Sequence, residues 1–287
     1  MTMNYKIIFK TVAGSHLYGT NRPDSDMDIR GVCLPPMEAL LGLARFEQHE
    51  VPGEDTVIYG VRKFCRLALK ANPNLVEMLF VPEDAILEID EYGKRLIENR
   101  YLFLSTKVVH TYSGYAFSQL KRIEGHRRWL LNPPIEPTLG QFGGVLVKGQ
   151  AHFPNQQKQQ DYKGALREWK QYNTWRENRN PVRAEMERKY GLDCKHASHL
   201  ARLLLQARTI LTRPEKFSPR LCGLDKKMVL DILHGVWEYE KLVDWARQQE
   251  QELKELAETS SLPKKPPFKK VERMVMEMLT KYIGGIA

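Results

Sequence analysis

The sequence predicts an α/β (α+β) protein in which an N-terminal α/β unit is followed by a mostly helical unit. Segments rich in β-branched and aromatic residues, which are typical of strands, occur within the first 60 residues. After about residue 105, apolar residues recur instead at the spacing of helices. The chain has 287 residues, which suits one large domain or two smaller ones, and 42% of them are hydrophobic, so a core can be buried. We therefore expect one domain at residues 1–105 and a second at 106–287.

Three strands are expected in the first unit. The first spans Lys6–Val12 and stops at a Gly-Ser pair, after which a single helical turn fits His16–Gly19. The second spans Asp26–Leu34 and is closed by two consecutive prolines. The third spans Glu54–Tyr59 and follows a Pro-Gly turn. These three strands are expected to form a sheet, with the connecting loops at its edge.

Two helices are expected after the third strand. The segment Arg62–Ala71 is predicted as a helix because apolar residues recur at i, i+3, i+4 and i+7 from Val61. Asn72 ends this helix and caps the next, Leu75–Phe80, because an Asn side chain accepts hydrogen bonds from the free N–H groups of a helix start. The two helices are expected to cover the sheet.

The second unit is expected to be helical with one interruption. A Pro-, Gly- and Gln-rich stretch at 132–160 predicts a long loop or a small ribbon. The strongest helix is Lys195–Leu211, with its leucines on one face. A Pro/Lys linker at Pro263–Pro267 precedes a final helix near Val271–Tyr282.

Composition limits the possible settings of the protein. The net charge of +9 favours an anionic partner such as a nucleotide, RNA or DNA. The longest apolar runs are shorter than a membrane span requires, and the N-terminus is too charged for a signal peptide. The four cysteines are widely scattered, which disfavours a zinc site and fits reduced thiols in a cytoplasmic protein.

The chemistry is concentrated in the run from Gly14 to Gly31. Asp26 and Asp28 stand two residues apart on a predicted strand, so their carboxylates face the same side. Two carboxylates that close repel each other unless a cation lies between them. Oxygen ligands of this kind suit Mg²⁺ or Mn²⁺. Met27 is expected on the opposite, core-facing side, and Asp24 is expected to form the loop before the strand.

A site for two metal ions needs a third carboxylate. Asp55, at the start of the third strand, is the candidate, and Glu54 on the opposite face is the alternative. Gly14 and Ser15 supply a second element, because free N–H groups and a hydroxyl at a strand-to-helix junction can bind phosphate oxygens. Metal ions and phosphates together predict an in-line displacement at phosphorus.

These motifs resemble the DNA polymerase beta-like nucleotidyltransferase superfamily. The pattern G-S-x-x-x-G, four residues, then D-S-D-x-D-x-x-G carries the resemblance. Within the superfamily, the chain looks like the predicted nucleotidyltransferases related to the RNA-ligase-associated group. Further similarity lies at Tyr59–Phe64, at Asn72–Asn74 with Glu77, and at Lys195–Leu200 with Arg202 and Leu203. The resemblance thus spans about residues 7–213.

The resemblance implies a catalytic core with a short mixed sheet, followed by a helical domain. It implies that Gly14 and Ser15 hold the triphosphate of an NTP substrate. It further implies that Asp26, Asp28 and Asp55 hold two Mg²⁺ or Mn²⁺ ions. Two cations of the helical half, Lys195 and Arg202, are expected to reach the triphosphate or the acceptor.

The helical half is strongly basic. Residues 163–213 contain twelve Lys or Arg and five Asp or Glu, with aromatic residues between them. Such a surface suits nucleic acid, with bases stacked on rings, although we expect Trp169 and Trp175 to point into the core. A second basic cluster lies at residues 121–129 and serves an acceptor or is an exposed helix end. His196 and His199 are expected to be structural.

Two hypotheses of different kinds follow. The first is an enzyme that transfers a nucleoside monophosphate from an NTP to an acceptor hydroxyl and releases pyrophosphate. RNA, such as a tRNA end, is the favoured acceptor; a protein hydroxyl or a small molecule is the alternative. The second is a nucleotide- or RNA-binding module without chemistry, against which the retained carboxylates Asp26 and Asp28 argue.

Overall fold

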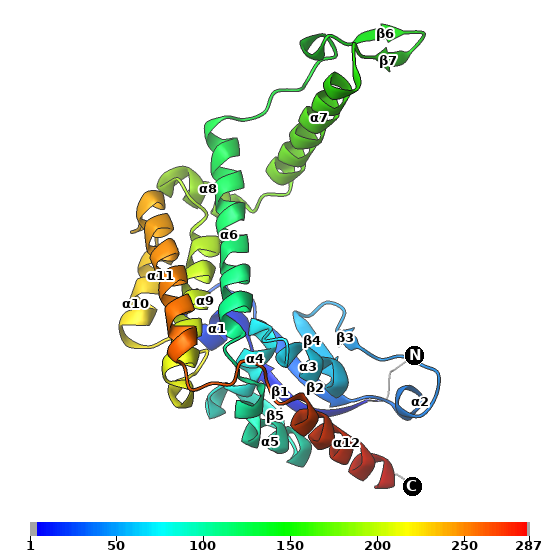
Figure 1. The fold of residues 1–287 in the computed structure, drawn as a ribbon, viewed down its shortest axis with the longest axis vertical. Helices are drawn as coiled ribbons and strands as arrows, with labels where there is room; N and C mark the ends of the chain where they lie inside the picture. Colours follow the sequence, from blue (N-terminus) through cyan, green and yellow to red (C-terminus); the bar gives the residue numbers. More distant parts are fainter. Residues whose placement is uncertain (1–4, 286–287) are drawn as a thin grey trace.

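The protein combines a small sheet and its covering helices with a larger group of helices, from which a long arm projects (Figure 1). The computed structural model describes residues 5–285, apart from the side chains of residues 182 and 183. The predicted α/β (α+β) class, with a mixed sheet followed by a mostly helical region, is confirmed.

The sheet contains five strands in the order β3-β4-β2-β1-β5. Their bounds are β1 Lys6–Val12, β2 Ile29–Leu34, β3 Gln48–Glu50, β4 Thr56–Gly60 and β5 Ile86–Ile89. The sheet is mixed, because β2 pairs with β4 in parallel whereas the β1–β2, β1–β5 and β3–β4 pairs are antiparallel. The central strands β1 and β2 carry the buried side chains Ile8, Phe9, Val32 and Leu34.

The strand predictions are correct for the first strand and need correction elsewhere. The second strand begins at Ile29 rather than at Asp26, because residues 22–28 form a loop. The third begins at Thr56 rather than at Glu54. Two edge strands, β3 and β5, were not predicted, since each has only three or four residues and a largely polar or mixed sequence.

Short helices cover the sheet. They are α1 Gly14–Tyr18, α2 Met37–Leu40, α3 Val61–Ala68, α4 Pro73–Leu79 and α5 Glu91–Glu98, with 3-10 turns at Glu83–Ala85 and Arg100–Phe103. The predicted helices after the third strand are confirmed as α3 and α4, although α3 is shorter than predicted. The predicted cap is also confirmed, because the Asn72 side chain accepts a hydrogen bond from the N–H of Asn74 at 3.1 Å.

The helical group is organised around α9. Its members are α6 Val108–Leu131, α8 Pro181–Tyr190, α9 Cys194–Thr212, α10 Gly223–Leu233 and α11 Tyr239–Thr259, with a 3-10 turn at Pro214–Lys216. Thirteen of the residues of α9 are buried, and it packs against α6, α10 and α11. Its hydrophobic core is continuous with that of the sheet, so the two regions share one apolar interior.

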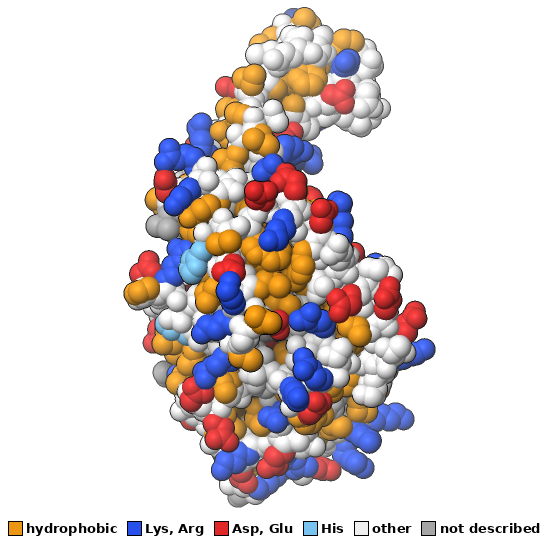
Figure 2. Space-filling model, turned by 90° about the vertical axis from the view of Figure 1, so that its left-hand side faces the viewer, with side chains coloured by type: hydrophobic (Ala, Val, Ile, Leu, Met, Phe, Trp, Pro, Cys, Tyr) orange, Lys and Arg blue, Asp and Glu red, His pale blue; other side chains and the backbone are white. Residues whose placement is uncertain are grey.

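The arm is formed by the outer part of α6 and by α7 Gln156–Glu177, which are connected through a 3-10 turn at Gly140–Phe142 and the ribbon β6 Val145–Val147 and β7 Gln150–His152. The ribbon lies at the tip (Figure 1). In Figure 2 the tip shows mostly hydrophobic and uncharged atoms, whereas Lys and Arg side chains stand along the stem, interspersed with Asp and Glu.

The arm corrects one expectation about the core. All of α7 is described, and it contains no fully buried residue. Trp169 and Trp175 are therefore half-buried residues of the arm, and the expectation that they point into the core was wrong. The reason is that α7 has only a weak apolar stripe and faces a single other helix near its base.

The final helix, α12 Phe268–Gly284, returns to the N-terminal region. It packs near α3, and its side chains form ion pairs with α5, namely Arg95 with Glu277 and Glu91 with Lys281. We still propose a division of the chain into residues 1–105 and 106–287. In this division α12 belongs to the second part of the sequence but packs against the first. None of the described helices combines the length and the apolar character that crossing a bilayer would demand.

Candidate active site

All seven residues proposed from the sequence line one cavity. It has a volume of 580 Å³, within the range of about 300–1,000 Å³ typical of small-molecule sites. Its walls come from the loops at the edge of the sheet, from α4 and from α9, so both halves of the chain contribute. The proposed residues that line it are Gly14, Ser15, Asp26, Asp28, Asp55, Lys195 and Arg202.

Gly14 lies directly against the carboxylate of Asp28. The β1–β2 pairing brings Val12 opposite Ile29, and the N–H of Ala13 donates to the carbonyl of Asp28 at 2.8 Å. A Cβ atom on Gly14 would lie 2.0 Å from Oδ2 of Asp28, and its φ of +61° is the left-handed conformation that favours glycine. The chain thus needs glycine here for both space and backbone conformation.

Asp28 and Asp55 lie at the same end of two neighbouring parallel strands. The register pairs Ile29 with Thr56, and the N–H of Ile29 donates to the carbonyl of Asp55 at 2.9 Å. Asp28 thus immediately precedes Ile29, and Asp55 immediately precedes Thr56, the strand partner of Ile29. Glu54 lies outside the cavity lining and accepts a hydrogen bond from the hydroxyl of Thr56 at 3.1 Å. Of the two alternatives, Asp55 is the one placed at the cavity.

Arg30 links the two aspartates and was not proposed from the sequence. Its guanidinium donates to Oδ1 of Asp28 at 3.2 Å and to the backbone carbonyl of Asp55 at 2.9 Å. An arginine two residues beyond an aspartate carries no motif, so only the folded register of β2 and β4 identifies it. Arg30 holds the Asp28 carboxylate in place and partly neutralises it.

Asp26 is presented by a loop rather than by a strand. The loop is fixed by a turn in which the Ser25 hydroxyl accepts from the N–H of Arg22 at 2.8 Å, and by a 3.0 Å hydrogen bond between Nε2 of His16 and the carbonyl of Ser25. Met27 is 50% exposed, so the expectation that it faces the core was wrong. The residues directly before Ile29 are not part of a strand, so the alternation of side chains on which the expectation for Met27 depended does not apply to them.

The floor of the cavity is a buried ion pair. Arg202 on α9 pairs with Glu77 on α4, donates to Oε1 of Gln206 at 2.9 Å and lies 3.7 Å from the centre of the Tyr18 ring. The hydroxyl of Tyr18 donates to the other Glu77 oxygen at 2.8 Å. Burial acts to lower the pKa of Arg202, but Glu77 and Tyr18 outweigh it and raise the pKa. Arg202 therefore stays charged and joins the two halves.

Four further residues of α9 line the cavity, namely Cys194, Lys195, Ser198 and His199. The side chain of Lys195 is exposed. His199 is largely buried, and burial, followed by the charge of Arg202, lowers its pKa to about 3. The imidazole is therefore neutral at physiological pH. The helix start is fixed by Asp193, whose side chain accepts from the N–H of His196 at 3.0 Å.

The sequence model of RlaP, described as the RNA repair pathway DNA polymerase beta family, matches residues 2–277. The chain belongs to the RNA repair pathway DNA polymerase beta family. It is thus a polymerase-beta-like nucleotidyltransferase by family, as the resemblance of its motifs implies.

One curated relative is the uncharacterized 38.9 kDa protein in the nrdC-mobD intergenic region of Enterobacteria phage T4. It is 28% identical over 138 residues, which are 42% of this chain and 40% of the relative. The match thus spans about two fifths of that protein. A solved structure, a nucleotidyltransferase-like protein from Exiguobacterium sibiricum, aligns over 88% of this chain and 69% of its own, with 10% identity and a TM-score of 0.27.

Members of polymerase-beta-like families generally use divalent metals, and the donor set here fits such ions. Three carboxylates and a glycine that leaves Asp28 accessible line the same cavity, and hard oxygen donors are the ligands that Mg²⁺ and Mn²⁺ prefer. The oxygens of Asp26, Asp28 and Asp55 do not all lie within 4.8 Å of one another.

A second group of ionisable residues adjoins the cavity, and one of its members, Asp193, lines it. Among the described residues, His126, Glu187 and Asp193 bring ligand-type atoms within 4.8 Å of one another. Glu187 forms an ion pair with Arg179, and Asp193 already caps α9. These bonds make the group a structural support for the start of α9.

Proposed function

We propose that the protein is a metal-dependent enzyme that transfers a nucleoside monophosphate from an NTP to a hydroxyl at an RNA end, with release of pyrophosphate. The observation that carries the proposal is the meeting of Asp28, Asp55 and Gly14-Ser15 on one wall of one cavity. Family membership supports nucleotidyl transfer, and the choice of RNA rests on the basic helical half.

Each cavity residue has a proposed part. Asp26 and Asp28 would hold both divalent ions, and Asp55 would hold the ion nearer the acceptor. The ions would neutralise phosphate charge and lower the pKa of the acceptor hydroxyl. Gly14 and Ser15 would hold the triphosphate through backbone N–H groups and a hydroxyl. Lys195, exposed at the mouth, would attract the phosphates, whereas Arg202 would act as a positioning residue because its charge is engaged by Glu77.

The proposed reaction is an in-line displacement. The acceptor oxygen forms a bond to the α-phosphorus, and the bond from that phosphorus to the oxygen shared with the β-phosphate breaks. Pyrophosphate leaves with the electron pair of the broken bond. The hydroxyl proton passes to water near Asp55, which is exposed on the cavity wall.

The test is incubation of the protein with each of the four labelled NTPs, with Mg²⁺ or Mn²⁺, and with total cellular RNA or total protein as acceptor. We expect the RNA fraction to be labelled with one preferred nucleotide, and label to disappear when a chelator is added. Label in protein alone would contradict the RNA acceptor. Tight NTP binding without label in any fraction would support a binding module in place of the enzyme.

A further inference from the structure

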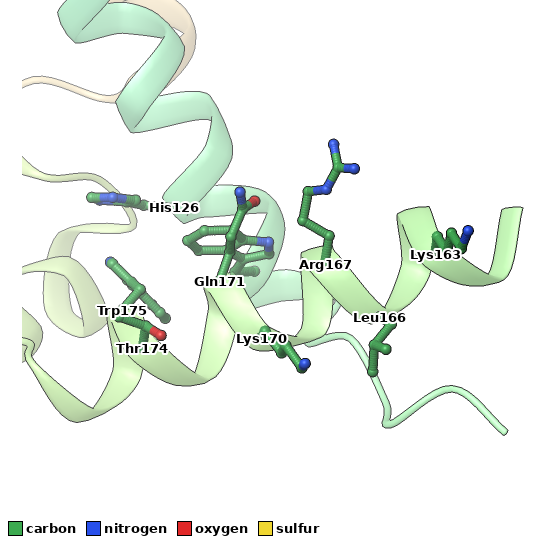
Figure 3. Close-up of a pocket in the computed structure, with 9 residues that line it drawn as sticks. His126, Lys163, Leu166, Arg167, Lys170, Gln171, Thr174 and Trp175 are labelled. Atoms are coloured by element: carbon green, nitrogen blue, oxygen red, sulfur yellow. The ribbon is translucent and has the colours of Figure 1, made fainter. Parts of the chain in front are cut away.

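A second groove lies on the arm, between α6 and α7. It has a volume of 610 Å³ and is lined by His126 and Trp129 from α6 and by seven residues of α7. Figure 3 shows His126 facing Trp175 across the groove, with Lys163 and Arg167 farther along α7. The residues of α7 are Lys163, Leu166, Arg167, Lys170, Gln171, Thr174 and Trp175.

One end of the groove is a wall of aromatic rings. The ring centres of Trp129 and Trp175 are 5.3 Å apart, as are those of His126 and Trp175, and Tyr172 lies 5.9 Å from Trp175. Both tryptophans are only partly buried. Nε1 of Trp129 has no hydrogen-bond partner among the described residues although it is buried. The guanidinium of Arg179 covers part of Trp175, 4.4 Å from its ring centre. The remaining exposed surface of the two tryptophans indicates a place that can receive a flat ligand.

The other end of the groove is a row of cations. Lys163, Arg167 and Lys170 follow at i, i+4 and i+7, so they lie on one face of α7, and all three are exposed. No acidic group in the described part of the chain forms an ion pair with any of them. In contrast, Arg128 nearby is paired with Glu168 at 2.7 Å. The positive charges of Lys163, Arg167 and Lys170 are therefore available to an anionic ligand.

The groove adjoins the candidate active site. His126 lines the groove, and its Nδ1 lies 3.9 Å from Oδ2 of Asp193, which lines the cavity. A single layer of side chains thus separates the two hollows. The two hollows thus meet at the His126–Asp193 contact, which places the aromatic end of the groove beside the cavity.

We propose that the arm groove binds the single-stranded segment of an acceptor RNA upstream of its reactive end. Bases would stack on Trp129 and Trp175, and phosphates would pair with Lys163, Arg167 and Lys170. This combination of ring faces and a track of cations is how proteins bind single strands with little sequence preference. An acidic peptide would satisfy the cations but leave the ring faces unused. The proposal rests on the proposed function for the identity of the acceptor.

The test measures RNA binding without NTP, so it does not depend on transfer. A fluorescent single-stranded RNA 12-mer is titrated with the wild-type protein and with a triple variant carrying Lys163→Ala, Arg167→Ala and Lys170→Ala. We expect the variant to bind on the order of 10²-fold more weakly at low salt, with a salt slope reduced by about 2, because three phosphate contacts are lost. Lys158→Ala, on α7 but outside the groove, is the matched control and should bind as the wild type does.

A second readout separates stacking from charge alone. RNA should quench tryptophan emission, whereas polyphosphate, which has charge but no bases, should bind more weakly and leave the emission unchanged. Equal RNA affinity of the triple variant and the wild type would overturn the proposal, as would RNA binding without quenching. RNA binding lost in the triple variant but no transfer by the wild type would reject the proposed function and keep the groove.

Discussion

The candidate active-site cavity and the arm groove are of similar volume but are built in opposite ways. The cavity is formed by segments far apart in the chain, and its floor is the buried Glu77–Arg202 pair. The groove is formed by two helices that are neighbours in sequence, and its cations are exposed. Fixed groups in a rigid wall suit catalysis, whereas exposed cations and open rings suit capture of a long substrate. We therefore expect substitutions in the cavity and substitutions in the arm groove to have different effects on the protein.

The largest expected effect comes from the paired alternatives for the third carboxylate. Asp55→Asn should lower the rate of nucleotidyl transfer by on the order of 10³-fold, because a metal ligand and its charge are lost. Glu54→Gln is the matched control, since Glu54 is adjacent but lies outside the cavity lining. Rates of labelled NTP incorporation decide between them. A large loss in Glu54→Gln with normal activity in Asp55→Asn would reverse the assignment.

The next effect is on stability. Glu77→Gln should lower the free energy of unfolding by about 3–5 kcal/mol, because it leaves the charge of Arg202 buried without its partner. Glu47→Gln removes a comparable carboxylate from the exposed pair with Arg66, and should cost less than about 1 kcal/mol. Urea unfolding of both variants measures the contrast. Equal losses of unfolding free energy would show that the burial of the Glu77–Arg202 pair does not make its removal more costly than that of an exposed pair.

A smaller effect is expected on acid stability. The folded state holds the pKa of His199 at about 3, well below its usual value, through burial and the charges of Arg202, His196, Arg122 and Lys195. Below about pH 6.5 the unfolded chain binds a proton that the folded chain does not, so stability falls as pH falls. Between pH 7 and pH 5 this group should cost about 2 kcal/mol.

His199→Gln removes that titration, so its unfolding free energy should fall less between pH 7 and pH 5 than that of the wild type. Urea unfolding at the two pH values measures the difference. Identical losses in the two proteins would mean that His199 is protonated in the folded state, contrary to its burial.

The smallest effect is expected at the arm tip. In β6, Val145, Leu146 and Val147 are 59%, 67% and 47% exposed, so replacing residues 145–152 with a Gly-Ser linker should change the unfolding free energy by less than about 1 kcal/mol. Leu200→Ala on the fully buried face of α9 is the contrasting variant and should cost about 3 kcal/mol. A loss of several kcal/mol on tip replacement would show that the arm is integral to the fold.

Local sequence signals predicted the parts of the fold that depend on nearby residues. The first strand, the Asn72 cap and the α9 helix follow from propensity and spacing, and all are confirmed. The Asp24–Ser25 loop was also expected. The start of the second strand was misplaced because the loop continues through Asp28, held in part by the hydrogen bond between His16 and the Ser25 carbonyl, which strand propensity does not encode.

Long-range contacts account for what the sequence could not predict. The role of Arg30 depends on the parallel register of β2 and β4, and the engagement of Arg202 depends on Glu77, which is 125 residues away. The arm groove was missed because Trp175 has the residue type of a core and only the tertiary structure leaves it partly open. Motifs thus predicted which residues share the cavity, whereas the structure supplied their partners.

The central claim is tested most directly by nucleotidyl transfer in Asp26→Asn and Asp28→Asn. Labelled NTP, Mg²⁺ and RNA are incubated with each variant and with the wild type, and circular dichroism verifies that the variants are folded. We expect the wild type to transfer the nucleotide and a chelator to abolish that transfer. We also expect both folded variants to have lost transfer. Full transfer in both variants would contradict the central claim.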